Sequence, residues 1–316
     1  MINKQRYRDF ANRENIPVFS QPWWLDSICG EDNWDVLLYE KGGEIWASFP
    51  YYMKNNSILM PKLTQTMGPY IRYPKNQKYY KKLSWEKEIM NYFIDNLPNF
   101  DFFNVSFHYS VTNWLPFYWN GFTQTTRYTY VIDKNIDIEI LSKNFETDIR
   151  RRRKKAENLG ISVYESDDIK KFYELNNMTF RRQKLEIPYS FKFIDKLYKN
   201  LKYNNTCKIF FAEYEKEIIA ANFLIYDNDT VYYLMGGINP DKKDLGAMDV
   251  ILYESIKFAL KSGKNFDFEG SMIESIEKYF RSFGAIQKQY FQISKTNSKR
   301  LRFINALKEM AKVILK

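Results

Sequence analysis

The pattern of hydrophobic and polar positions is clearest in the segment 246–284. Apolar residues recur at helical spacing from Ala247 to Leu260 and predict a helix. The next four residues, Asn265 to Phe268, alternate polar and aromatic and predict a short strand. A second amphipathic run extends from Ile273 to Phe283, and Gly284 follows it where a left-handed residue most easily ends a helix. We therefore predict the order helix, strand, acidic turn, helix.

A weaker copy of this segment lies in the first half of the chain. Asn99 to Phe102 has the same four letters as Asn265 to Phe268. Each copy stands between two helix-like runs, and a tyrosine-rich strand follows each, at 125–132 and 287–293. This shared order of elements predicts a duplicated unit and hence two similar domains.

The other elements follow from the same periodicities. In the first half we predict a short helix opening at Pro22 and a hairpin with strands 34–40 and 44–53. The second half is predicted to hold a basic helix near 144–160, a strand at 161–165, helices at 168–184 and 190–201, strands at 208–214, 217–226 and 230–236, and a docked basic helix at 300–316. The segment 133–137 is the best boundary, so we predict domains at 1–137 and 138–316.

Composition indicates a folded, globular chain. The 316 residues allow one large or two ordinary domains, and 45% of them are hydrophobic. No apolar run approaches the roughly 20 residues that a membrane span needs. No signal peptide opens the sequence, so Cys29 and Cys207, far apart in the chain, are interpreted as reduced thiols in the cytoplasm.

The formal net charge of +10 favours a negatively charged partner such as RNA, a phosphorylated substrate or an anionic membrane surface. A basic proteome average is the alternative explanation. The run Arg150 to Lys155 holds six cations, which on a helix occupy nearly every azimuth and cannot all share one face. The candidate phosphate- or RNA-binding residues in this run are Arg150, Arg151, Arg153 and Lys154.

The sequence contains a single histidine, His108, at the end of a predicted strand. A multi-histidine metal site is therefore excluded, and no cysteine pair has ligand spacing, so we predict no metal. A Ser-His or Cys-His nucleophilic site would have to use His108, which we interpret as structural.

The order helix, helix, three antiparallel strands, helix, strand, helix, strand resembles the GNAT acyltransferase fold. Two such domains in tandem resemble the FemABX family of aminoacyl- and acyltransferases. The resemblance rests on four stretches, which are 21–24, 147–160, 232–237 and 266–284. It implies an α+β (α/β) protein of two tandem GNAT-like domains, each a mixed, mostly antiparallel sheet flanked by helices.

The resemblance also implies site residues and a donor. A Phe-Lys pair of that family lies near the transferred group, and the matching positions here are Phe280 and Arg281. Arginine keeps the charge but cannot donate a proton near neutral pH. The turn 243–248 keeps only one glycine of the pyrophosphate-binding pattern of coenzyme A-dependent enzymes. The donor is therefore either aminoacyl-tRNA or an acyl-CoA such as acetyl-CoA, with no cofactor bound permanently.

Acyl transfer to an amine needs alignment, a base and stabilisation of the oxyanion. Asp267 and Glu269 stand at a strand end with side chains on one face, and Glu269 is the candidate base. Asp267 is a catalytic candidate whose alternative role is capping the strand end. Backbone N–H groups near Leu234 to Gly236 are candidate oxyanion donors. The first-half counterpart of Glu269 is Phe103, which suggests that only the second domain keeps the acidic group.

We expect the acceptor in a cleft between domains, where ligand sites concentrate. The substrate-binding candidates are Tyr70, Arg72, Arg127, Tyr128, Tyr233 and Arg181. The alternative roles are a surface arginine or a tyrosine that packs on a sheet.

Three functions remain open. The first is transfer of an acyl or aminoacyl group from an anionic donor to an amine of a cell-envelope or polysaccharide precursor, either small or lipid-linked. The second is acyl-CoA-dependent N-acetylation of a small molecule. The third is a non-catalytic protein that binds RNA or a membrane surface. The expected location is the cytoplasm. If the acceptor is lipid-linked, we expect a peripheral position at the inner face of the membrane.

Overall fold

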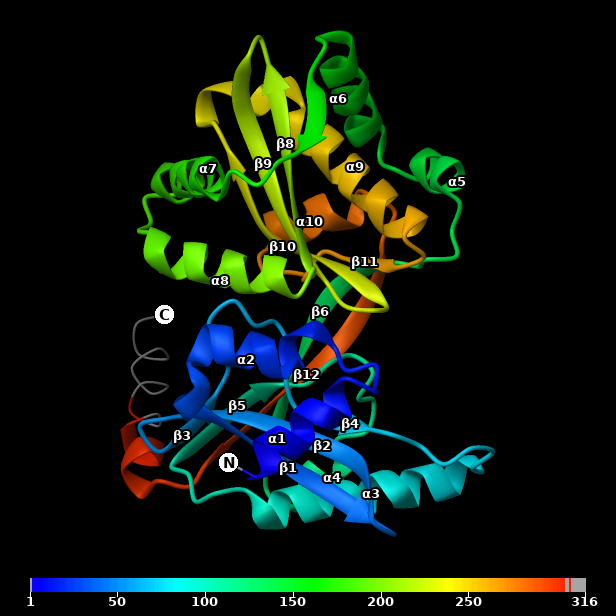
Figure 1. Ribbon diagram of the computed structural model, residues 1–316, viewed down its shortest axis with the longest axis vertical. Coiled ribbons are helices and arrows are strands. Elements are labelled where there is room, and N and C mark those ends of the chain that lie inside the picture. Colours follow the sequence, from blue (N-terminus) through cyan, green and yellow to red (C-terminus); the bar gives the residue numbers. More distant parts are fainter. Residues whose placement is uncertain (1, 305–306, 308–316) are drawn as a thin grey trace. The chain divides into compact units, whose positions relative to one another are not determined.

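The computed structural model describes residues 2–304 and 307 (Figure 1). The chain divides into two compact units. Unit 1 contains Met1–Arg127 and Gln289–Lys316, and unit 2 contains Tyr128–Lys288. Two strands, β6 (Thr123–Ile132) and β12 (Ile286–Thr296), begin in one unit and end in the other.

Unit 1 is a mixed sheet with helices. Its strands run in the order β1-β2-β3-β5-β12-β6, and β4 pairs with β2. The pairs are antiparallel except β3 with β5, among those whose register is known. The strands are β1 (Trp34–Lys41), β2 (Glu44–Lys54), β3 (Ser57–Leu59), β4 (Tyr70–Ile71) and β5 (Phe102–Ser106), and the helices are α1 (Ile2–Ala11), α2 (Pro22–Cys29), α3 (Tyr79–Asn96) and α4 (Leu115–Trp119).

Unit 2 has the sheet order β6-β11-β10-β9-β8-β7, in which only β10 and β11 are parallel. Its strands are β7 (Ser162–Glu165), β8 (Cys207–Tyr214), β9 (Glu217–Tyr226), β10 (Thr230–Ile238) and β11 (Asn265–Asp267). Its helices are α5 (Ile138–Lys143), α6 (Thr147–Asn158), α7 (Ile169–Arg182), α8 (Phe191–Tyr203), α9 (Ala247–Lys261) and α10 (Glu274–Arg281), and a 3-10 turn spans Pro240–Leu245.

Local sequence signals explain several boundaries in unit 2. The Asp168 side chain accepts a hydrogen bond from the Lys171 amide at 2.9 Å and caps α7. Ser190 caps α8 in the same way through the Phe193 amide. Glu215 and Lys216, with φ of 50° and 66°, form the tight turn between β8 and β9.

Unit 2 buries two hydrophobic clusters that hold α9 against the sheet. One includes Leu252 and Ile256 of α9 together with Phe266 and Phe268 beside β11. The other joins Ala247 and Ile251 of α9 to the small residues of β8 and β9. Because both clusters include α9, this helix has a fixed position relative to β10 and β11, where the pocket described below opens.

The predicted fold class is confirmed: the sheets are mixed and mostly antiparallel, and helices flank them. Two helices, α1 and α5, were not predicted, because α1 carries mainly polar residues and α5 has only six residues. Residues 299–304 and 307 are helical, whereas the rest of the predicted helix 300–316 lies outside the described residues. None of the described helices is both long enough and apolar enough to cross a membrane.

The repeated four-letter motif occupies different structural positions in its two copies. Asn265 to Asp267 form β11, whereas β5 begins only at Phe102, the last letter of the first copy. The order helix, strand, helix, strand is shared around both copies, but the motif does not mark equivalent residues.

The predicted boundary at 137/138 lies ten residues beyond the observed division at 127/128, and the segment from Gln289 belongs to unit 1. The predicted second domain had included this segment. The difference arises because β12 leaves unit 2 and pairs with β5, as in the pair Gln292↔Ser106. A strand that crosses between units has no local signature in the sequence.

Candidate active site

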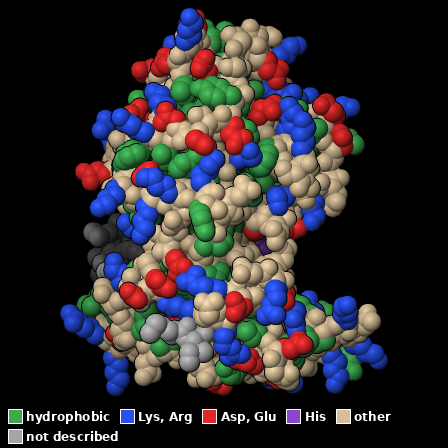
Figure 2. Space-filling view, in the orientation of Figure 1, with side chains coloured by type: hydrophobic (Ala, Val, Ile, Leu, Met, Phe, Trp, Pro, Cys, Tyr) green, Lys and Arg blue, Asp and Glu red, His purple; other side chains and the backbone are tan. Residues whose placement is uncertain are grey.

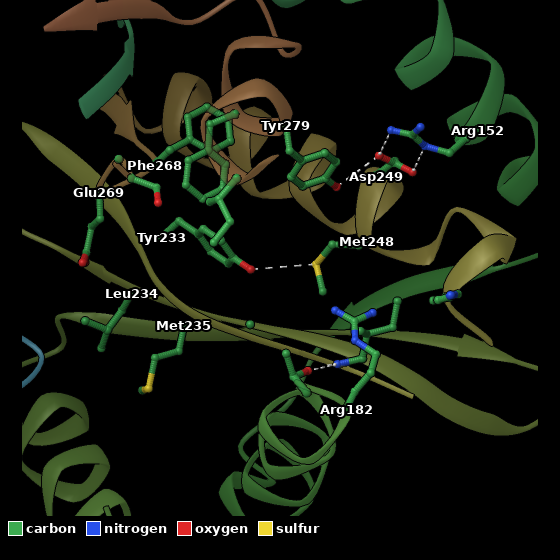
Figure 3. Close-up of a pocket in the computed structure, with 18 of the residues that line it drawn as sticks. Arg152, Arg182, Tyr233, Leu234, Met235, Met248, Asp249, Phe268, Glu269 and Tyr279 are labelled. Carbon is green, nitrogen blue, oxygen red and sulfur yellow. Dashed lines mark hydrogen bonds and ion pairs between the residues drawn. The ribbon is translucent and has the colours of Figure 1, made fainter. Parts of the chain in front are cut away.

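Unit 2 contains a pocket of about 760 Å³ at the place where its sheet opens (Figure 3). Strands β10 and β11 pair only from Thr230↔Asn265 to Tyr232↔Asp267. Beyond this point β10 continues beside β9 to Ile238, while the chain after Asp267 turns away. The pocket is lined by residues of α6, α7, β10, α9 and α10 and of the turn after β11.

A β-bulge in β10 shapes one wall. The pairing with β9 passes from Tyr233↔Leu224 to Met235↔Phe223, so Leu234 is the extra residue. A bulge re-aims neighbouring side chains, and all three residues 233–235 line the pocket. The Asn176 side chain of α7 donates a hydrogen bond to the Gly236 carbonyl at 2.7 Å and holds the bulged segment from the helix side.

The turn after β11 holds Glu269 in an unusual backbone conformation. Glu269 has φ 59° and Gly270 has φ 61°. A Cβ at Gly270 would lie 2.1 Å from the Tyr128 carbonyl oxygen, so only glycine fits there. For a residue with a side chain the left-handed region costs roughly 1–2 kcal/mol. The turn therefore holds Glu269 in an unfavourable backbone conformation, in which the residue lines the pocket.

The carboxyl of Glu269 is an unpaired acid at an apolar wall. Its Oε1 is buried and has no hydrogen-bond partner among the described residues, although the residue as a whole is half-buried. Burial, and secondarily the neighbouring Asp267 carboxylate, raise the pKa of Glu269 well above its ordinary value. A raised pKa makes the ionised form of this carboxyl a stronger base than an ordinary glutamate.

Asp267 lies directly behind Glu269 and is fully buried. Its Oδ1 accepts hydrogen bonds from the Thr129 hydroxyl and, at 2.8 Å, from the Glu269 amide. Its Oδ2 has no partner among the described residues. Burial raises the pKa of Asp267 to about 7, against the opposing effect of these two hydrogen bonds. The site therefore contains two coupled acids, one at the wall and one behind it.

Aromatic rings line the pocket beside Glu269. Phe268 and Phe280 stack with centroids 5.0 Å apart, and Tyr233 meets Phe280 edge-on at 6.0 Å. Burial raises the pKa of Tyr233 far above its ordinary value, so its hydroxyl stays protonated. This wall excludes water from one side of the Glu269 carboxyl and strengthens electrostatic interactions there.

A buried ion pair forms the opposite side of the pocket (Figure 3). Arg152 donates from Nε to Asp249 Oδ2 at 2.9 Å and from Nη2 to Oδ1 at 3.2 Å. The Tyr279 hydroxyl donates to the same Oδ1 at 3.0 Å. These bonds join α6, α9 and α10, and the Asp249 carboxylate raises the pKa of Arg152.

The rim beside α9 is positively charged. Arg182 and Lys243 line it together with one acid, Asp244, and neither cation forms an ion pair with another described residue. The helix begins at Gly246, whose φ is 84° and whose added Cβ would lie 2.4 Å from the Arg152 carbonyl oxygen. The first amides of a helix lack intrahelical acceptors and attract anions. Cations and amides together suit a phosphate group.

The structure brings part of the predicted site together. Glu269, Phe280 and Tyr233 line the pocket, and Asp267 supports Glu269 from behind. Arg281 does not line it: its side chain is 53% exposed and pairs with Glu277 at 3.4 Å.

The predicted phosphate-binding residues of α6 lie away from the pocket. Arg151 pairs with Asp148 at 3.2 Å, and Arg153 pairs with Glu157 at 3.1 Å. Arg150 and Lys154 are exposed, and Arg181 of α7 is exposed beside the lining residue Arg182. None of the five predicted cations of these two helices lines the pocket.

The remaining substrate-binding candidates are held by contacts within their own units. In unit 1 the Tyr70 hydroxyl donates to Glu14 at 3.0 Å. Arg72 pairs with Glu14 and Glu44 and lies over the Trp46 ring at 4.2 Å. Arg127 of unit 1 donates to the Gln292 side chain at 2.8 Å, and Tyr128 is the half-buried first residue of unit 2. These contacts give Tyr70, Arg72 and Arg127 a structural role.

Sequence reasoning missed Arg152 and Tyr279, and it did not place Arg182 and Lys243 in one site. The signal for Arg152 was present, since it lies three residues after Ile149 and four before Ala156, the two buried positions of α6. Arg182 ends the predicted helix 168–184 beside Arg181, and Lys243 stands in the turn compared with the pyrophosphate-binding pattern, but their proximity depends on the packing of α7 beside β10. The ring Nδ1 of His108, the single histidine, lies 2.8 Å from the Ser110 hydroxyl oxygen. The described residues contain no acidic, histidine and cysteine cluster fit for a metal ion.

Comparison with known proteins identifies the fold of this site. The acetyltransferase (GNAT) domain family matches residues 143–279, all within unit 2. FemX superposes with a TM-score of 0.68 at 13% identity, covering 92% of this chain and 96% of FemX. No curated protein matches the sequence.

Two further structures share the fold over most of their length. The C-terminal domain of a putative lysylphosphatidylglycerol synthetase from Agrobacterium fabrum has a TM-score of 0.55 at 10% identity, over 97% of this chain and 95% of that one. L-PGS from Bacillus licheniformis has a TM-score of 0.53 at 11% identity, over 84% and 86%. The predicted resemblance to GNAT and FemABX enzymes is thus confirmed for the fold: unit 2 matches the GNAT domain family, and the chain shares the fold of FemX along nearly its whole length.

Proposed function

We propose that this protein transfers an acyl or aminoacyl group from an anionic carrier to an amine of a cell-envelope or polysaccharide precursor. The observation that carries the proposal is the unpaired Glu269 carboxyl at an apolar pocket, where β10 and β11 separate within a GNAT domain. The similarity to FemX and to the C-terminal domain of a putative lysylphosphatidylglycerol synthetase supports the envelope as the setting.

Glu269 is the general base of the proposed reaction. The acceptor nitrogen attacks the carbonyl carbon of the donor, and Glu269 takes the proton that this nitrogen loses. The bond between the carbonyl carbon and the carrier oxygen or sulfur then breaks, and the carrier leaves with the proton that Glu269 took from the nitrogen. A positioned base contributes about 10²–10⁴ in rate.

The bulge of β10 is the proposed oxyanion site. Beyond Tyr232 the strand has no β11 partner, and Leu234 is also outside the regular ladder with β9. Backbone N–H groups of this segment are therefore available to a ligand in the pocket, and the Asn176 contact fixes the segment in place. One such donor is worth about 10²–10³ in rate.

The cationic rim is proposed to hold the phosphates of the carrier. Arg182 and Lys243 flank the beginning of α9, where the amides of Ala247 and Met248 lack intrahelical acceptors. Both aminoacyl-tRNA and acyl-CoA carry phosphates, so this rim suits either. The single glycine of the turn 243–248 matches the pyrophosphate-binding pattern of coenzyme A enzymes poorly, which favours aminoacyl-tRNA.

The second candidate function is acyl-CoA-dependent N-acetylation of a small molecule. It is favoured by the GNAT acetyltransferase match and by the left-handed Gly246 at the start of α9. This glycine is also required by its contact with Arg152, so it does not by itself indicate coenzyme A.

The acceptor site remains a prediction that rests on Tyr70, Arg72, Arg127 and Tyr128. If the acceptor is a lipid-linked envelope precursor, the protein works peripherally at the inner face of the membrane. Arg281 is proposed to assist electrostatically only, because it is exposed and paired with Glu277.

The test is transfer of labelled amino acid from aminoacyl-tRNA, or of labelled acetyl from acetyl-CoA, to lipid-linked and small amine acceptors. The wild type should label an amine from one donor. Glu269→Gln should lose the activity while binding the donor as tightly as the wild type does. Equal labelling by the wild type and Glu269→Gln would refute the assignment, and RNA binding without any transfer would favour the non-catalytic alternative.

Charge variants test the rim separately. Arg182→Glu and Lys243→Glu should weaken donor binding, because each replaces a pocket-lining cation by an anion. Arg181→Glu, which makes the same charge change on the neighbouring residue outside the pocket, is the matched control. Equal weakening by all three would indicate a general effect of net charge.

A further inference from the structure

Helices α3 and α4 of unit 1 expose large aromatic and aliphatic side chains on one surface. Tyr79 is 74% exposed and Trp119 is 57% exposed. Soluble proteins rarely expose large apolar residues in contiguous groups without a function. We call this group the α3–α4 surface, and its apolar members are Tyr79, Tyr80, Leu83, Leu115, Tyr118 and Trp119.

Three members of the α3–α4 surface, Leu83, Leu115 and Trp119, line one groove, and Tyr79 lies one helical turn before Leu83 on α3. The two helices pack side by side (Figure 1), and a groove of about 210 Å³ between them is lined by Leu83, Lys87, Leu115 and Trp119. The Lys87 ammonium lies 5.0 Å from the centre of the Trp119 ring. Aromatic, aliphatic and cationic side chains thus share one surface.

Lysines dominate the charge of this surface. Lys75, Lys78, Lys81 and Lys87 are all exposed. The only acidic residue from Lys75 to Lys87 is Glu86, which is buried and accepts hydrogen bonds from Tyr73 at 2.8 Å and Asn113 at 2.9 Å. On the face shown in Figure 2, by contrast, Lys and Arg side chains are interspersed with Asp and Glu.

We propose that the α3–α4 surface binds an anionic lipid membrane. Tyr and Trp are the side chains that prefer the bilayer interface, because one end is apolar and the other polar. Clustered lysines beside them are attracted by the negative potential of anionic lipids. The surface has no arginine, the residue that nucleic-acid sites favour for its bidentate contacts, so a membrane fits better than RNA.

This binding does not depend on transfer activity. It uses only unit 1 residues, none of which lines the candidate active site. An inactive protein would still bind, and an active protein that fails to bind would leave the proposed function standing. Binding requires no membrane-spanning segment, since interfacial residues and charge suffice for peripheral attachment.

The experiment is co-sedimentation of the full-length protein with vesicles of phosphatidylcholine alone and of phosphatidylcholine with phosphatidylglycerol as the minor component. The wild type should sediment with the anionic vesicles only, and less so at high salt, because salt screens exposed charges. The double variant Lys78→Glu, Lys81→Glu should lower the partition coefficient roughly tenfold or more. Tyr79→Ser with Trp119→Ser should lower it as well.

Matched variants on α8 control for charge and for exposed aromatic area. Lys192→Glu with Lys196→Glu makes the same charge change at exposed positions, and Tyr203→Ser removes a tyrosine that is 91% exposed. Both controls should sediment as the wild type does. Thermal unfolding should be unchanged in every variant, because all the changed side chains are exposed.

Three results would overturn the proposal. The first is failure of the wild type to bind anionic vesicles. The second is binding of single-stranded RNA that the same α3–α4 variants abolish while vesicle binding is absent or unaffected. The third is concentration-dependent dimerisation that the variants abolish without changing vesicle binding, which would assign the surface to a second copy of the chain.

Discussion

At the scale of single residues, the candidate active site contains two acids that lack hydrogen-bond partners among the described residues for one oxygen each. Glu269 has a buried oxygen without a hydrogen bond, and Asp267 has another just behind it. A buried, unsatisfied polar atom is costly, so its persistence at a pocket wall indicates a use. The physical coupling of the two acids gives two predictions.

The first prediction concerns the pH dependence of transfer by Asp267→Asn. The Asp267 carboxylate is the second cause of the raised pKa of Glu269, after burial. Removing that charge lowers the pKa of Glu269, so Glu269 stays deprotonated to lower pH. The acidic limb of the rate–pH profile should therefore move to lower pH.

Single-turnover rates of the wild type, Asp267→Asn and the rim variant Asp244→Asn across this limb give the measurement. Asp244→Asn removes an exposed carboxylate of the same pocket and should leave the limb in place. If the acidic limb of the rate–pH profile is unchanged in Asp267→Asn, or moves to higher pH, the two acids are not coupled as described.

The second prediction concerns stability. The pKa of Asp267 is raised to about 7 in the folded protein, so its protonated form is favoured by folding relative to the ionised form. The corresponding stabilisation is full below the unfolded pKa and is lost as pH rises through about 7. Each pKa unit corresponds to about 1.36 kcal/mol. The amide that replaces this carboxyl in Asp267→Asn does not titrate, so the fall in unfolding free energy between pH about 4 and about 7 should be shallower in the variant than in the wild type.

Urea unfolding at several pH values measures this slope. Glu269 titrates in the same direction, so part of the slope should persist in the variant. Equal slopes in both proteins would mean that Asp267 is ionised in the folded state at acidic pH.

The sequence allowed prediction of Glu269 and Asp267 as candidates because residues two apart at a strand end point the same way. It did not allow prediction of their electrostatics. The raised pKa values come from Phe268, Phe280 and the absence of donors, which depend on how α10 packs over the strand end.

At the scale of secondary-structure elements, a run of cations on α6 divides into different roles. Arg152 makes two bonds to Asp249, whereas Arg151 makes one exposed pair within the helix. Asp249 is 4% exposed and also accepts from Tyr279, so the pair fixes α6 and α10 to α9. The helical spacing from the apolar residues Ile149 and Ala156 would have identified Arg152 as the cation on the inward face of α6.

The third prediction follows from this division. Arg152→Ala leaves the buried Asp249 carboxylate with Tyr279 as its remaining partner. This change should lower the unfolding free energy by about 2–3 kcal/mol. The loss is smaller than for a fully buried pair because the Arg152 side chain is 37% exposed. Arg151→Ala removes a pair whose arginine is 76% exposed, and should change the unfolding free energy by less than about 0.5 kcal/mol. Equal losses in urea unfolding would contradict the different roles.

At the scale of the whole molecule, the chain does not divide into consecutive domains. Unit 1 takes its β12 segment from the end of the chain, and this segment pairs with β5 from Gln292↔Ser106 to Thr296↔Phe102. The sequence predicted both strands and two similar halves. It could not predict that β12 pairs with β5 of unit 1, because strand order depends on long-range pairing and not on local periodicity.

The fourth prediction tests this arrangement. A chain that ends at Lys288 lacks the strand that pairs with β5, so unit 1 should lose protection from amide hydrogen exchange at residues 102–106. Unit 2 should keep protection in β8 and β9, whose pairing is complete within the unit. Hydrogen exchange read by mass spectrometry makes the comparison, and full protection of residues 102–106 in the shortened chain would contradict it.

The central claim is that Glu269 removes the acceptor proton during acyl transfer in the unit 2 pocket. The most direct test is single-turnover transfer from pre-bound donor, aminoacyl-tRNA or acetyl-CoA, by the wild type and Glu269→Gln, because it separates chemistry from binding. The account predicts that Glu269→Gln binds the donor as the wild type does and transfers about 10²–10⁴ times more slowly. Equal single-turnover rates in the two proteins would contradict it.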